Sequence, residues 1–387
     1  MKNLKIRKEL LEQEKISYAM DHIELPEGGV DCSEGCNPYG FPQACIDVLR
    51  NFDPARLGPY PHSPALYDAI SDYWKEQIDV ERGNILLTDG SISALYIVNN
   101  IFDTHNAVVL GVSPQFTDYY MHAGMIGIEY APYQLEKKNN YKFETDDFLE
   151  MHYEEAEEDT AIGKSYNFIY IDNPNNPTGQ CIDISDIERI VKEAVKFDIT
   201  VIIDEAYGDF MPKENSAVTL FAKYPNLIVV RTLSKAFGLA GMRVGYIIAH
   251  KNMIACMKKM VNPYMVGELT REIAAEAISH RDHIEKSMAD FAAMKCSIRK
   301  ALGCSEEFPG GDKGRLHLAE TLDTNSLMLL YHDDPDIDLS REFLSRGVLV
   351  IDGNDFKGLD SSSARVRLPV ISEFPVLLSA IEDINRL

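Results

Sequence analysis

The stretch LIVVRTLSKAFGLAGMR, residues 227–243, places a lysine directly after an apolar run. The run at 227–231 has the β-branched composition of a strand. Lys235 follows it and is hemmed in by the small and apolar residues 236–241. A lysine in such surroundings loses hydration, so its pKa falls and its neutral amine becomes a nucleophile toward an aldehyde. An isolated lysine after a strand is otherwise a solvated surface residue, and the stretch alone leaves the two interpretations equally open.

Two further apolar runs also end in polar residues. Residues 168–172 lead into NPNNPTG at 173–179, which by itself is a composition typical of a turn. Residues 200–203 lead into Asp204, and a carboxylate at the end of so apolar a run is costly to bury unless it meets a cation. A protonated pyridine nitrogen would be such a cation.

A fourth run, 85–88, leads into Gly90 and Ser91 at the start of a predicted helix. Backbone N–H groups and a hydroxyl at a helix N-terminus can bind an anion, although the same residues also form ordinary N-caps. In open α/β sheets, ligands bind at the carboxyl ends of the strands. The four strand ends are therefore expected to contribute to one site.

Apolar runs alternate with helical patterns along most of the chain, which predicts a mostly parallel sheet covered by helices. The expected fold class is α/β, with a three-layer α/β/α large domain and a smaller α+β domain. The expected division is 45–270 for the large domain, with 1–44 and 271–387 forming the small domain and an N-terminal arm at 3–20. The expected strands are 85–88, 107–111, 168–172, 200–204, 227–231, 244–249, 326–331, 348–351 and 365–368. The expected helices are 91–102, 184–196, 270–302 and 375–387.

Composition and charge argue against several classes of partner. The 387 residues carry a formal net charge of −23 from 38 basic and 61 acidic residues, whereas a grip on phosphate backbones needs clustered Lys and Arg. No apolar run approaches the ~20 residues that span a bilayer, and the charged start MKNLKIRKELLEQEKI is not a signal peptide. We expect neither nucleic acid nor membrane as a partner, and a cytoplasmic location.

The cysteines and histidines do not predict a metal site. Seven cysteines leave an odd one and lack the density of a disulfide scaffold. Cys32 and Cys36 lie four residues apart, but no second pair or nearby histidine accompanies them. His62 is interpreted as a loop residue.

Three motifs occur in order: NPTG at 176–179, Asp204-x-x-Tyr207, and Ser234-Lys235-x7-Arg243. Together they resemble the fold-type I enzymes that depend on pyridoxal 5′-phosphate (PLP), in the class I/II aminotransferase superfamily. NPYG at 37–40, and Gly358-Leu359-Asp360 before Arg365, are similar to the histidinol-phosphate aminotransferase and threonine-phosphate decarboxylase group. The similarity spans roughly residues 30 to 370, nearly the whole chain.

The resemblance implies that Lys235 forms an aldimine with PLP and then shuttles the α-proton. It implies that Asp204 pairs with the pyridinium nitrogen. The other implied cofactor contacts are Asn176 and Tyr207 at the phenolic oxygen, Phe116 on the ring face, Gly90, Ser91, Ser234 and Arg243 at the 5′-phosphate, and Tyr60 reaching that phosphate from the neighbouring subunit. Taken singly, several of these residues are equally well explained as core, loop or strand-end residues; their order and spacing carry the interpretation.

The resemblance also implies the substrate contacts. Arg365 would bind the α-carboxylate, with Arg367 as the alternative, and Asn176 and Gly40 would contribute further contacts. Because Tyr60 completes the neighbouring site, the expected assembly is a homodimer with shared active sites. The expected substrates are an amino acid and a 2-oxo acid.

Three positions depart from the pattern of the group. Ile351 replaces an arginine that often faces a substrate phosphate, which argues against a phosphorylated substrate. Phe116 replaces a common tyrosine and keeps only its stacking. Asp31 and Glu34, on the Gly-rich loop, would favour a basic amino acid if they face the substrate, and would have no such role as solvated loop carboxylates.

The motifs predict the cofactor but do not decide the reaction. Amino transfer is the first expectation. PLP-dependent decarboxylation, or O2-consuming oxidation of a basic amino acid such as arginine, remains as an alternative. A non-catalytic PLP-binding protein is disfavoured, because binding alone does not require Lys235, Asp204 and Arg365 together.

Overall fold

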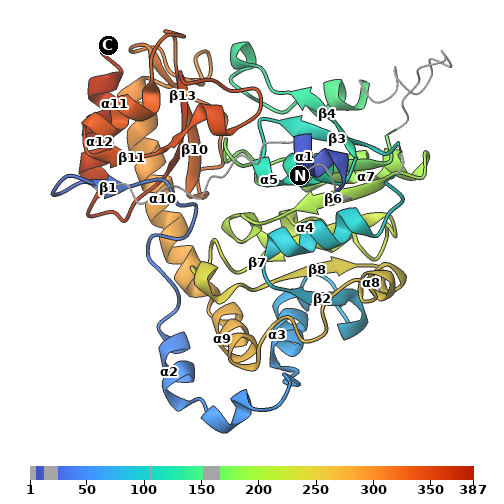
Figure 1. The fold of residues 1–387 in the computed structure, drawn as a ribbon. Helices are drawn as coiled ribbons and strands as arrows, with labels where there is room; N and C mark the ends of the chain where they lie inside the picture. Colours follow the sequence, from blue (N-terminus) through green and yellow to red (C-terminus); the bar gives the residue numbers. More distant parts are fainter. Residues whose placement is uncertain (1–5, 13–24, 105, 151–165) are drawn as a thin grey trace, which may run out of the picture.

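The computed structural model describes residues 6–12, 25–104, 106–150 and 166–387, which form two lobes (Figure 1). Of the expected N-terminal arm at 3–20, the described part is helix α1 (Lys8–Glu12), and the rest lies outside the described residues. Across the described residues no helix is long and apolar enough to cross a bilayer.

The large lobe is built on a seven-stranded sheet in the order β2-β8-β7-β6-β5-β3-β4. All neighbouring pairs are parallel except those of β8, which is antiparallel to both β2 and β7. The strands are β2 (Ile85–Thr88), β3 (Val108–Ser113), β4 (Glu129–Gln134), β5 (Phe168–Asp172), β6 (Thr200–Asp204), β7 (Leu227–Thr232) and β8 (Gly245–Ala249). This confirms the expected α/β class with a mostly parallel sheet.

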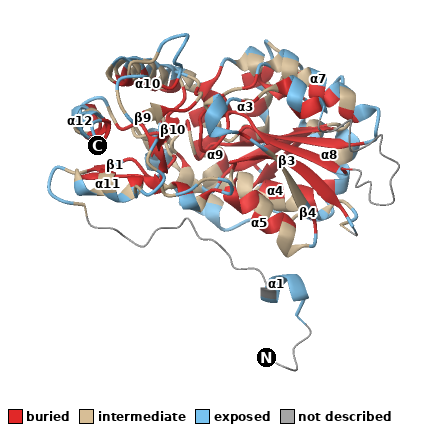
Figure 2. Ribbon diagram, turned by 90° about the horizontal axis from the view of Figure 1, so that it is seen from above, coloured by how far each residue is buried: buried red, intermediate tan, exposed pale blue. Residues whose placement is uncertain are grey.

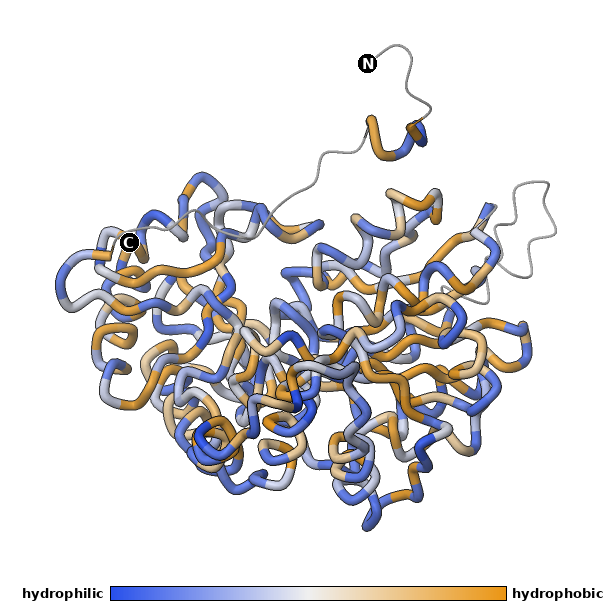
Figure 3. Tube along the Cα trace, turned by 60° about the horizontal axis from the view of Figure 1, so that its bottom comes forward, coloured by the Kyte–Doolittle hydropathy of each residue, from blue (hydrophilic) through white to orange (hydrophobic). Residues whose placement is uncertain are grey.

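Side chains of the central strands alternate between two apolar layers, because successive residues of a strand point to opposite faces. On β5, Ile169 and Ile171 enter one layer and Tyr170 enters the other. Helices α3 (Ala65–Trp74), α7 (Ile184–Val195) and α9 (Glu268–Ser279) contribute to the first layer, and α4 (Ser91–Asn100), α5 (Thr117–Met125) and α8 (Lys251–Met257) to the second. Figure 2 shows the strands buried between these helices, and Figure 3 shows their hydrophobic character.

The small lobe contains a four-stranded antiparallel sheet in the order β12-β13-β10-β9. Its strands are β9 (Leu316–Leu318), β10 (Leu327–His332), β12 (Ile351–Asp352) and β13 (Ser363–Arg367). Near the N-terminus, β1 (Val30–Asp31) pairs in parallel with β11 (Val348–Leu349), so the start of the chain completes this lobe as expected. The remaining α-helices are α2 (Ala44–Asn51), α10 (Arg281–Leu302), α11 (Leu339–Ser345) and α12 (Phe374–Ile384).

Several elements differ from the sequence-based expectation. The strand expected at 348–351 is divided between β11 and β12, which belong to different sheets, and β9 was not expected. Two further differences have clear physical reasons. β4 was not expected because its sequence, EYAPYQ, contains a proline and a charged residue; it forms at the sheet edge, where its side chains are only partly buried. The single helix expected at 270–302 is interrupted at His280, whose backbone is not helical. α9 therefore packs beside α2 and α3, while α10 runs on to the small lobe (Figure 1).

Candidate active site

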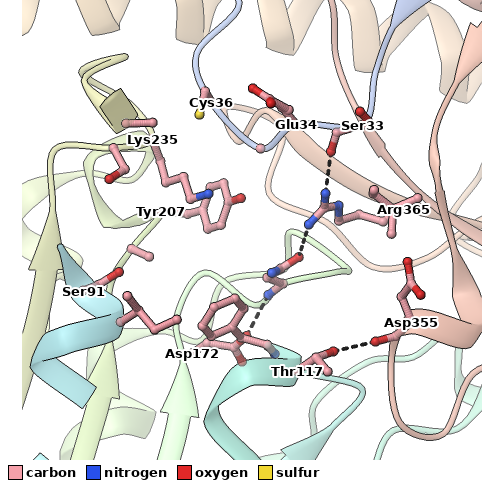
Figure 4. Close-up of a pocket in the computed structure, with 18 of the residues that line it drawn as sticks. Ser33, Glu34, Cys36, Ser91, Thr117, Asp172, Tyr207, Lys235, Asp355 and Arg365 are labelled. Carbon is pink, nitrogen blue, oxygen red and sulfur yellow. Dashed lines mark hydrogen bonds between the residues drawn. The ribbon is translucent and has the colours of Figure 1, made fainter. Parts of the chain in front are cut away.

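A cavity of about 890 Å³ lies where the carboxyl ends of β5, β6 and β7 face the small lobe. Most of the residues named by the motifs line it, and Figure 4 shows how they converge from both lobes. The lining residues of the large lobe include Ser91, Phe116, Asp172, Asn176, Asp204, Tyr207, Ser234, Lys235 and Arg243. Those from the N-terminal loop and the small lobe include Asp31, Ser33, Glu34, Gly35, Cys36, Leu349, Ile351, Asp355, Phe356 and Arg365.

Lys235 is positioned by the turn that follows β7. Thr232 Oγ1 accepts a hydrogen bond from the backbone N–H of Ser234 at 3.2 Å, which tightens this turn. The backbone N–H of Asn37 donates to the Lys235 carbonyl at 2.9 Å, so the N-terminal loop is fastened over the lysine. The side chain of Lys235 is half-buried, and its Nζ lies 5.5 Å from the centroid of the Tyr207 ring.

Two buried carboxylates lie side by side at this edge, because Asp172 on β5 pairs directly with Asp204 on β6. Asp204 accepts hydrogen bonds from Tyr170 Oη and from the backbone N–H of Ala206, both at 3.0 Å. Burial raises the pKa of Asp204 to about 6, against the opposing effect of these bonds and of the Lys235 ammonium. A cationic ligand group beside Asp204 would favour its ionised form.

Asp172 was not predicted as a site residue, although it ends an apolar strand in the same way as Asp204. Its Oδ2 accepts from the backbone N–H groups of Asn176, at 2.9 Å, and Phe116, at 3.3 Å. Its Oδ1 accepts from Asn175 Nδ2 at 2.8 Å. Burial raises the pKa of Asp172 to about 7. This carboxylate therefore holds two segments that carry expected cofactor contacts.

Tyr207 presents a polar atom with no protein partner to the cavity. Its side chain is 2% exposed, and within the described chain its Oη makes no hydrogen bond. A buried hydroxyl without a partner is costly, so this atom indicates a ligand that accepts or donates a hydrogen bond. A Cβ added at Gly35 would collide with Tyr207 Oη, so only glycine allows the N-terminal loop to approach so closely.

The N-terminus of α4 lies at one end of the cavity. Gly90 precedes the helix with φ of +107°, and a Cβ there would lie 2.5 Å from Arg243 Nη2. Arg243 Nη2 in turn donates to the carbonyl of Asp89 at 3.3 Å. Ser91, Ser234 and Arg243 all line the cavity, and with the helix terminus they suit a phosphate group.

Arg365 enters from β13 and is held at both sides of its guanidinium. Nη1 donates to Asn176 Oδ1 at 3.1 Å, and Nη2 donates to the Ser33 carbonyl at 2.5 Å. Arg367 stands on the same face of β13 but does not line the cavity; its guanidinium donates to the carbonyls of Asp31, Glu34 and Leu368. The structure therefore favours Arg365 over Arg367 as the carboxylate-binding residue.

Three expected contacts do not line the cavity. Gly90 precedes α4, whose residues Ser91 and Ile92 line the cavity in its place. Gly40 does not line the cavity. Its carbonyl accepts a hydrogen bond from His283 and packs against Gly238, and the glycine of this loop that lines the cavity is Gly35. Gly40 is five residues too far along the loop, whose path is set by β1 and Asn37. Tyr60 is 71% exposed and stacks on Tyr264 with ring centroids 4.7 Å apart. It does not line the cavity of its own chain, so its role at the neighbouring subunit stays a prediction.

Some lining residues had no signal in the sequence. Thr117, Leu349, Asp355 and Phe356 reach the cavity only through packing of the small lobe against α5, in which Thr117 Oγ1 donates to the Asp355 carbonyl at 2.5 Å. Among the residues that the structure describes, no group of three or more His, Cys, Asp or Glu side chains is placed to hold a metal ion.

The residues present fit PLP at each of its polar ends. A buried carboxylate, Asp204, suits the ring nitrogen, and the unpartnered Oη of Tyr207 suits the phenolic oxygen. The α4 terminus with Arg243 suits the phosphate, and Lys235 supplies a primary amine between them. Phe116 lines the cavity as a possible ring partner.

Comparison with known proteins agrees with this geometry. The family described as aminotransferase class I and II matches residues 41–374. The chain is 29% identical over 366 residues to the histidinol-phosphate aminotransferase of Methanocaldococcus jannaschii, covering 93% of this chain and 90% of that protein.

Solved structures show the same fold. The histidinol-phosphate aminotransferase from Clostridium acetobutylicum has a TM-score of 0.77 at 21% identity, covering 92% of this chain and 99% of that one. The enzyme of the same name from Sinorhizobium meliloti, in complex with pyridoxal-5′-phosphate, has a TM-score of 0.72 at 17% identity, covering 92% and 90% of the two chains.

Proposed function

The chain belongs to the aminotransferase class I and II family and is a pyridoxal-5′-phosphate-dependent enzyme that transfers amino groups, and we propose that Lys235 is the residue with which it does so. One observation carries the proposal. The side chains of Lys235, Asp204 and Arg365 line one cavity, although Lys235 follows β7, Asp204 ends β6 and Arg365 lies within β13 of the other lobe. The overall reaction needs no external oxidant, because the amino donor is oxidised to its 2-oxo acid while the acceptor is reduced to an amino acid.

When bound, PLP supplies an aldehyde carbon that captures the amino group and a ring that accepts the electrons released at the α-carbon. Asp204 would hold the ring nitrogen in its protonated form, because a cation beside it would stabilise its buried carboxylate. Tyr207 and Asn176 donate hydrogen bonds toward the phenolic oxygen. Phe116 limits the movement of the ring, and Asp172 fixes the backbone of both Phe116 and Asn176.

Lys235 has two tasks in this proposal. Its Nζ holds the cofactor while no substrate is present, and as a free amine it then carries a proton away from the substrate α-carbon. The turn from Thr232 to Ser234 and the hydrogen bond from Asn37 fix the lysine backbone, so that only its side chain moves.

Arg365 binds the α-carboxylate of the amino acid. Its guanidinium is buried and already held by Asn176 and Ser33, so little conformational freedom is lost on binding. The amino donor is an L-amino acid and the acceptor a 2-oxo acid. Histidinol phosphate, suggested by the names of the relatives, has a phosphate ester in place of the α-carboxylate and is therefore the comparison donor that we expect to react poorly.

The assembly and location belong to the same proposal. We place the protein in the cytoplasm as a homodimer, with Tyr60 of each subunit at the phosphate of the other site. Support comes from exposed apolar residues near this tyrosine, such as Leu57 and Tyr264. The cofactor lobe is 45–270, and 1–44 with 271–387 form the second lobe, with α9 crossing the boundary. Nucleic acid and membrane are not expected partners, given the net charge of −23.

The test is a comparison of wild type with Lys235→Ala, using Lys251→Ala, an exposed lysine of the same lobe, as the control. We expect Lys235→Ala to lower keto-acid-dependent turnover by about 10⁴-fold or more, and Lys251→Ala to leave it unchanged. Borohydride reduction followed by peptide mapping should attach the cofactor to residue 235. An active Lys235→Ala variant, or product formed with uptake of O2 or release of CO2 and without a keto acid, would reject the proposal.

A further inference from the structure

The wall of the cavity opposite the large sheet carries three carboxylates. Asp31 ends β1, Glu34 comes from the loop that follows, and Asp355 comes from the short 3-10 helix η8 (Gly353–Asp355). Asp31 and Glu34 are exposed and Asp355 is half-buried. In the part of the chain that the structure describes, none of the three forms an ion pair.

Each basic residue that lines the cavity already has a proposed role. Lys235, Arg243 and Arg365 are the lysines and arginines among the lining residues, and the proposed function assigns them to the aldehyde, the phosphate and the α-carboxylate. Of the acidic lining residues, Asp204 and Asp172 have roles at the cofactor. The remaining charges, those of Asp31, Glu34 and Asp355, are all negative.

Two cations near this wall do not offset it. Arg367 directs its guanidinium at the backbone carbonyls of Asp31 and Glu34, not at their carboxylates. Lys357 Nζ lies over the rings of Tyr120 and Tyr130, 5.7 and 5.1 Å from their centroids, and does not line the cavity.

The surface between Arg365 and the carboxylates is apolar. Ile351 pairs with Arg365 across β12 and β13, so the two side chains stand on the same face of the sheet. Phe356 lies with its ring centroid 5.7 Å from Arg365 Cζ. Leu349 completes this surface. An aliphatic chain that begins at a carboxylate on Arg365 would therefore cross apolar side chains before it reaches Asp355 or Glu34.

That the cavity binds a ligand rests on grounds other than these carboxylates. Tyr207 Oη is buried, faces the cavity and has no hydrogen-bond partner among the described residues. Arg365 is 9% exposed and directs its guanidinium inward. Figure 4 shows Arg365 between the Ser33–Cys36 loop and Asp355.

We propose that the amino acid on which this enzyme acts carries a positively charged side chain, an amine or a guanidinium, whose charge is bound by Asp355, with Glu34 adding to the negative potential of the same cavity. The proposal rests on the proposed function, since it uses Arg365 as the site of the α-carboxylate. Asp31 contributes less, because its Oδ1 already accepts from the backbone N–H and Oγ of Ser33 at 2.8 and 2.6 Å.

Electrostatics then selects between substrates. A carboxylate or phosphate on the substrate side chain would meet three negative charges, and every lysine and arginine that lines the cavity already has a proposed role. Like charges brought together in this way repel each other, so such a substrate is disfavoured. Burial and the nearby Asp352 raise the pKa of Asp355 against the opposing effect of Arg365, so a further cation placed beside this carboxylate would stabilise its ionised form.

The first experiment measures the reaction of the PLP-loaded enzyme with matched amino acids. L-Arginine and L-ornithine are the cationic probes, L-citrulline and L-norvaline are neutral probes of similar shape, and L-glutamate and O-phospho-L-serine are anionic. Loss of the cofactor absorbance band is followed at several concentrations, with a 2-oxo acid added for turnover. We expect kcat/KM for arginine to exceed that for citrulline by about tenfold or more, since one well-placed charge is worth at least that factor.

Variants then assign the effect to particular carboxylates. Asp355→Asn should reduce the arginine-to-citrulline ratio by about tenfold and Glu34→Gln by a smaller factor, with citrulline kinetics little changed. Glu27→Gln is the control, because this exposed carboxylate lies near the same loop but does not line the cavity. An equal loss for all substrates in Asp355→Asn would show that this residue acts on Arg365 and the α-carboxylate and not on the substrate side chain, which would overturn the assignment.

A binding experiment separates this proposal from the catalytic one. 5-Guanidinopentanoate and hexanoate have no α-amino group and cannot react, but both present a carboxylate and an aliphatic chain. We expect the guanidino compound to raise the melting temperature of the enzyme and the hexanoate to have little effect, with the difference lost in Asp355→Asn. Equal binding of the two compounds, or faster reaction of neutral or anionic amino acids, would overturn this proposal while leaving the proposed function intact. An enzyme that reacts with no amino acid but distinguishes the two compounds would reject the proposed function alone.

Discussion

The two walls of the cavity contain carboxylates in opposite circumstances. On the large-lobe wall Asp172 and Asp204 are 5% and 2% exposed, and each is fixed by hydrogen bonds from neighbouring backbone or side chains. On the opposite wall Glu34 is exposed and Asp355 half-buried. A buried carboxylate needs partners in defined places, whereas an exposed one remains hydrated and can be exchanged at little cost. The first wall therefore suits a constant cofactor, and the second suits the choice of substrate.

The largest expected effect comes from the cofactor wall. Asp204→Asn should lower turnover by about 10³-fold, because a neutral amide cannot hold the ring nitrogen protonated; this corresponds to about 4 kcal/mol of transition-state stabilisation. The measurement is kcat for the PLP-saturated variant, with the cofactor absorbance confirming that PLP is still bound. Near-normal kcat in Asp204→Asn would contradict the assignment of the buried wall to the cofactor.

The arginine on β13 should give the next largest effect. Arg365→Lys should lower kcat/KM for the amino acid by about 10²-fold, because an ammonium cannot make the two parallel hydrogen bonds of a guanidinium. Most of the loss should appear in KM.

Arg367→Lys is the matched control for that change. Arg367 is buried on the same face of β13 and also donates to the N-terminal loop, but it does not line the cavity. Its replacement should lower the melting temperature more than it changes KM. Comparable KM effects for the two variants would contradict the assignment of Arg365 alone to the substrate.

The smallest expected effect concerns Asp172 and pH. Its folded pKa of about 7 lies above the model-peptide value of 3.8 because of burial, so the stability that its protonated form contributes is present below about pH 4 and is lost as pH rises through 7. Asp172→Asn lacks this titration. Between pH 5 and pH 8 the cofactor-free wild type should therefore lose a few degrees of melting temperature relative to Asp172→Asn, since one pKa unit corresponds to about 1.4 kcal/mol.

That difference can be measured by thermal unfolding of both proteins at the two pH values. The same measurement on Asp355→Asn would compare the two walls directly. Because Asp355 is less buried than Asp172, the pH-dependent difference in melting temperature should be smaller for this variant. A melting-temperature difference that does not depend on pH would show that Asp172 is not protonated in the cofactor-free protein.

Much of the cofactor wall was predictable from local sequence. The strands at 168–172 and 200–204 begin and end where the apolar runs predict, and the motifs that follow them reach one edge because their strands are parallel. Asp172 was not predicted as a site residue because the motif that follows it, NPNNPTG, already accounted for a functional role at this strand end. β4 and the break at His280 were missed because edge position and a single non-helical residue leave little trace in composition.

Local sequence was enough to predict the cofactor, since Lys235, Asp204 and the α4 terminus that we propose for the phosphate each follow directly on a strand. The sequence left open whether Asp31 and Glu34 face the substrate and gave no signal for Asp355; only the folded chain shows that all three line the cavity. Glu34 and Asp355 are more than 300 residues apart along the chain, and they meet at one cavity only because β1 pairs with β11 and β12 pairs with β13. Exposed charged residues follow no periodicity, so their convergence can be found only once the strands are paired.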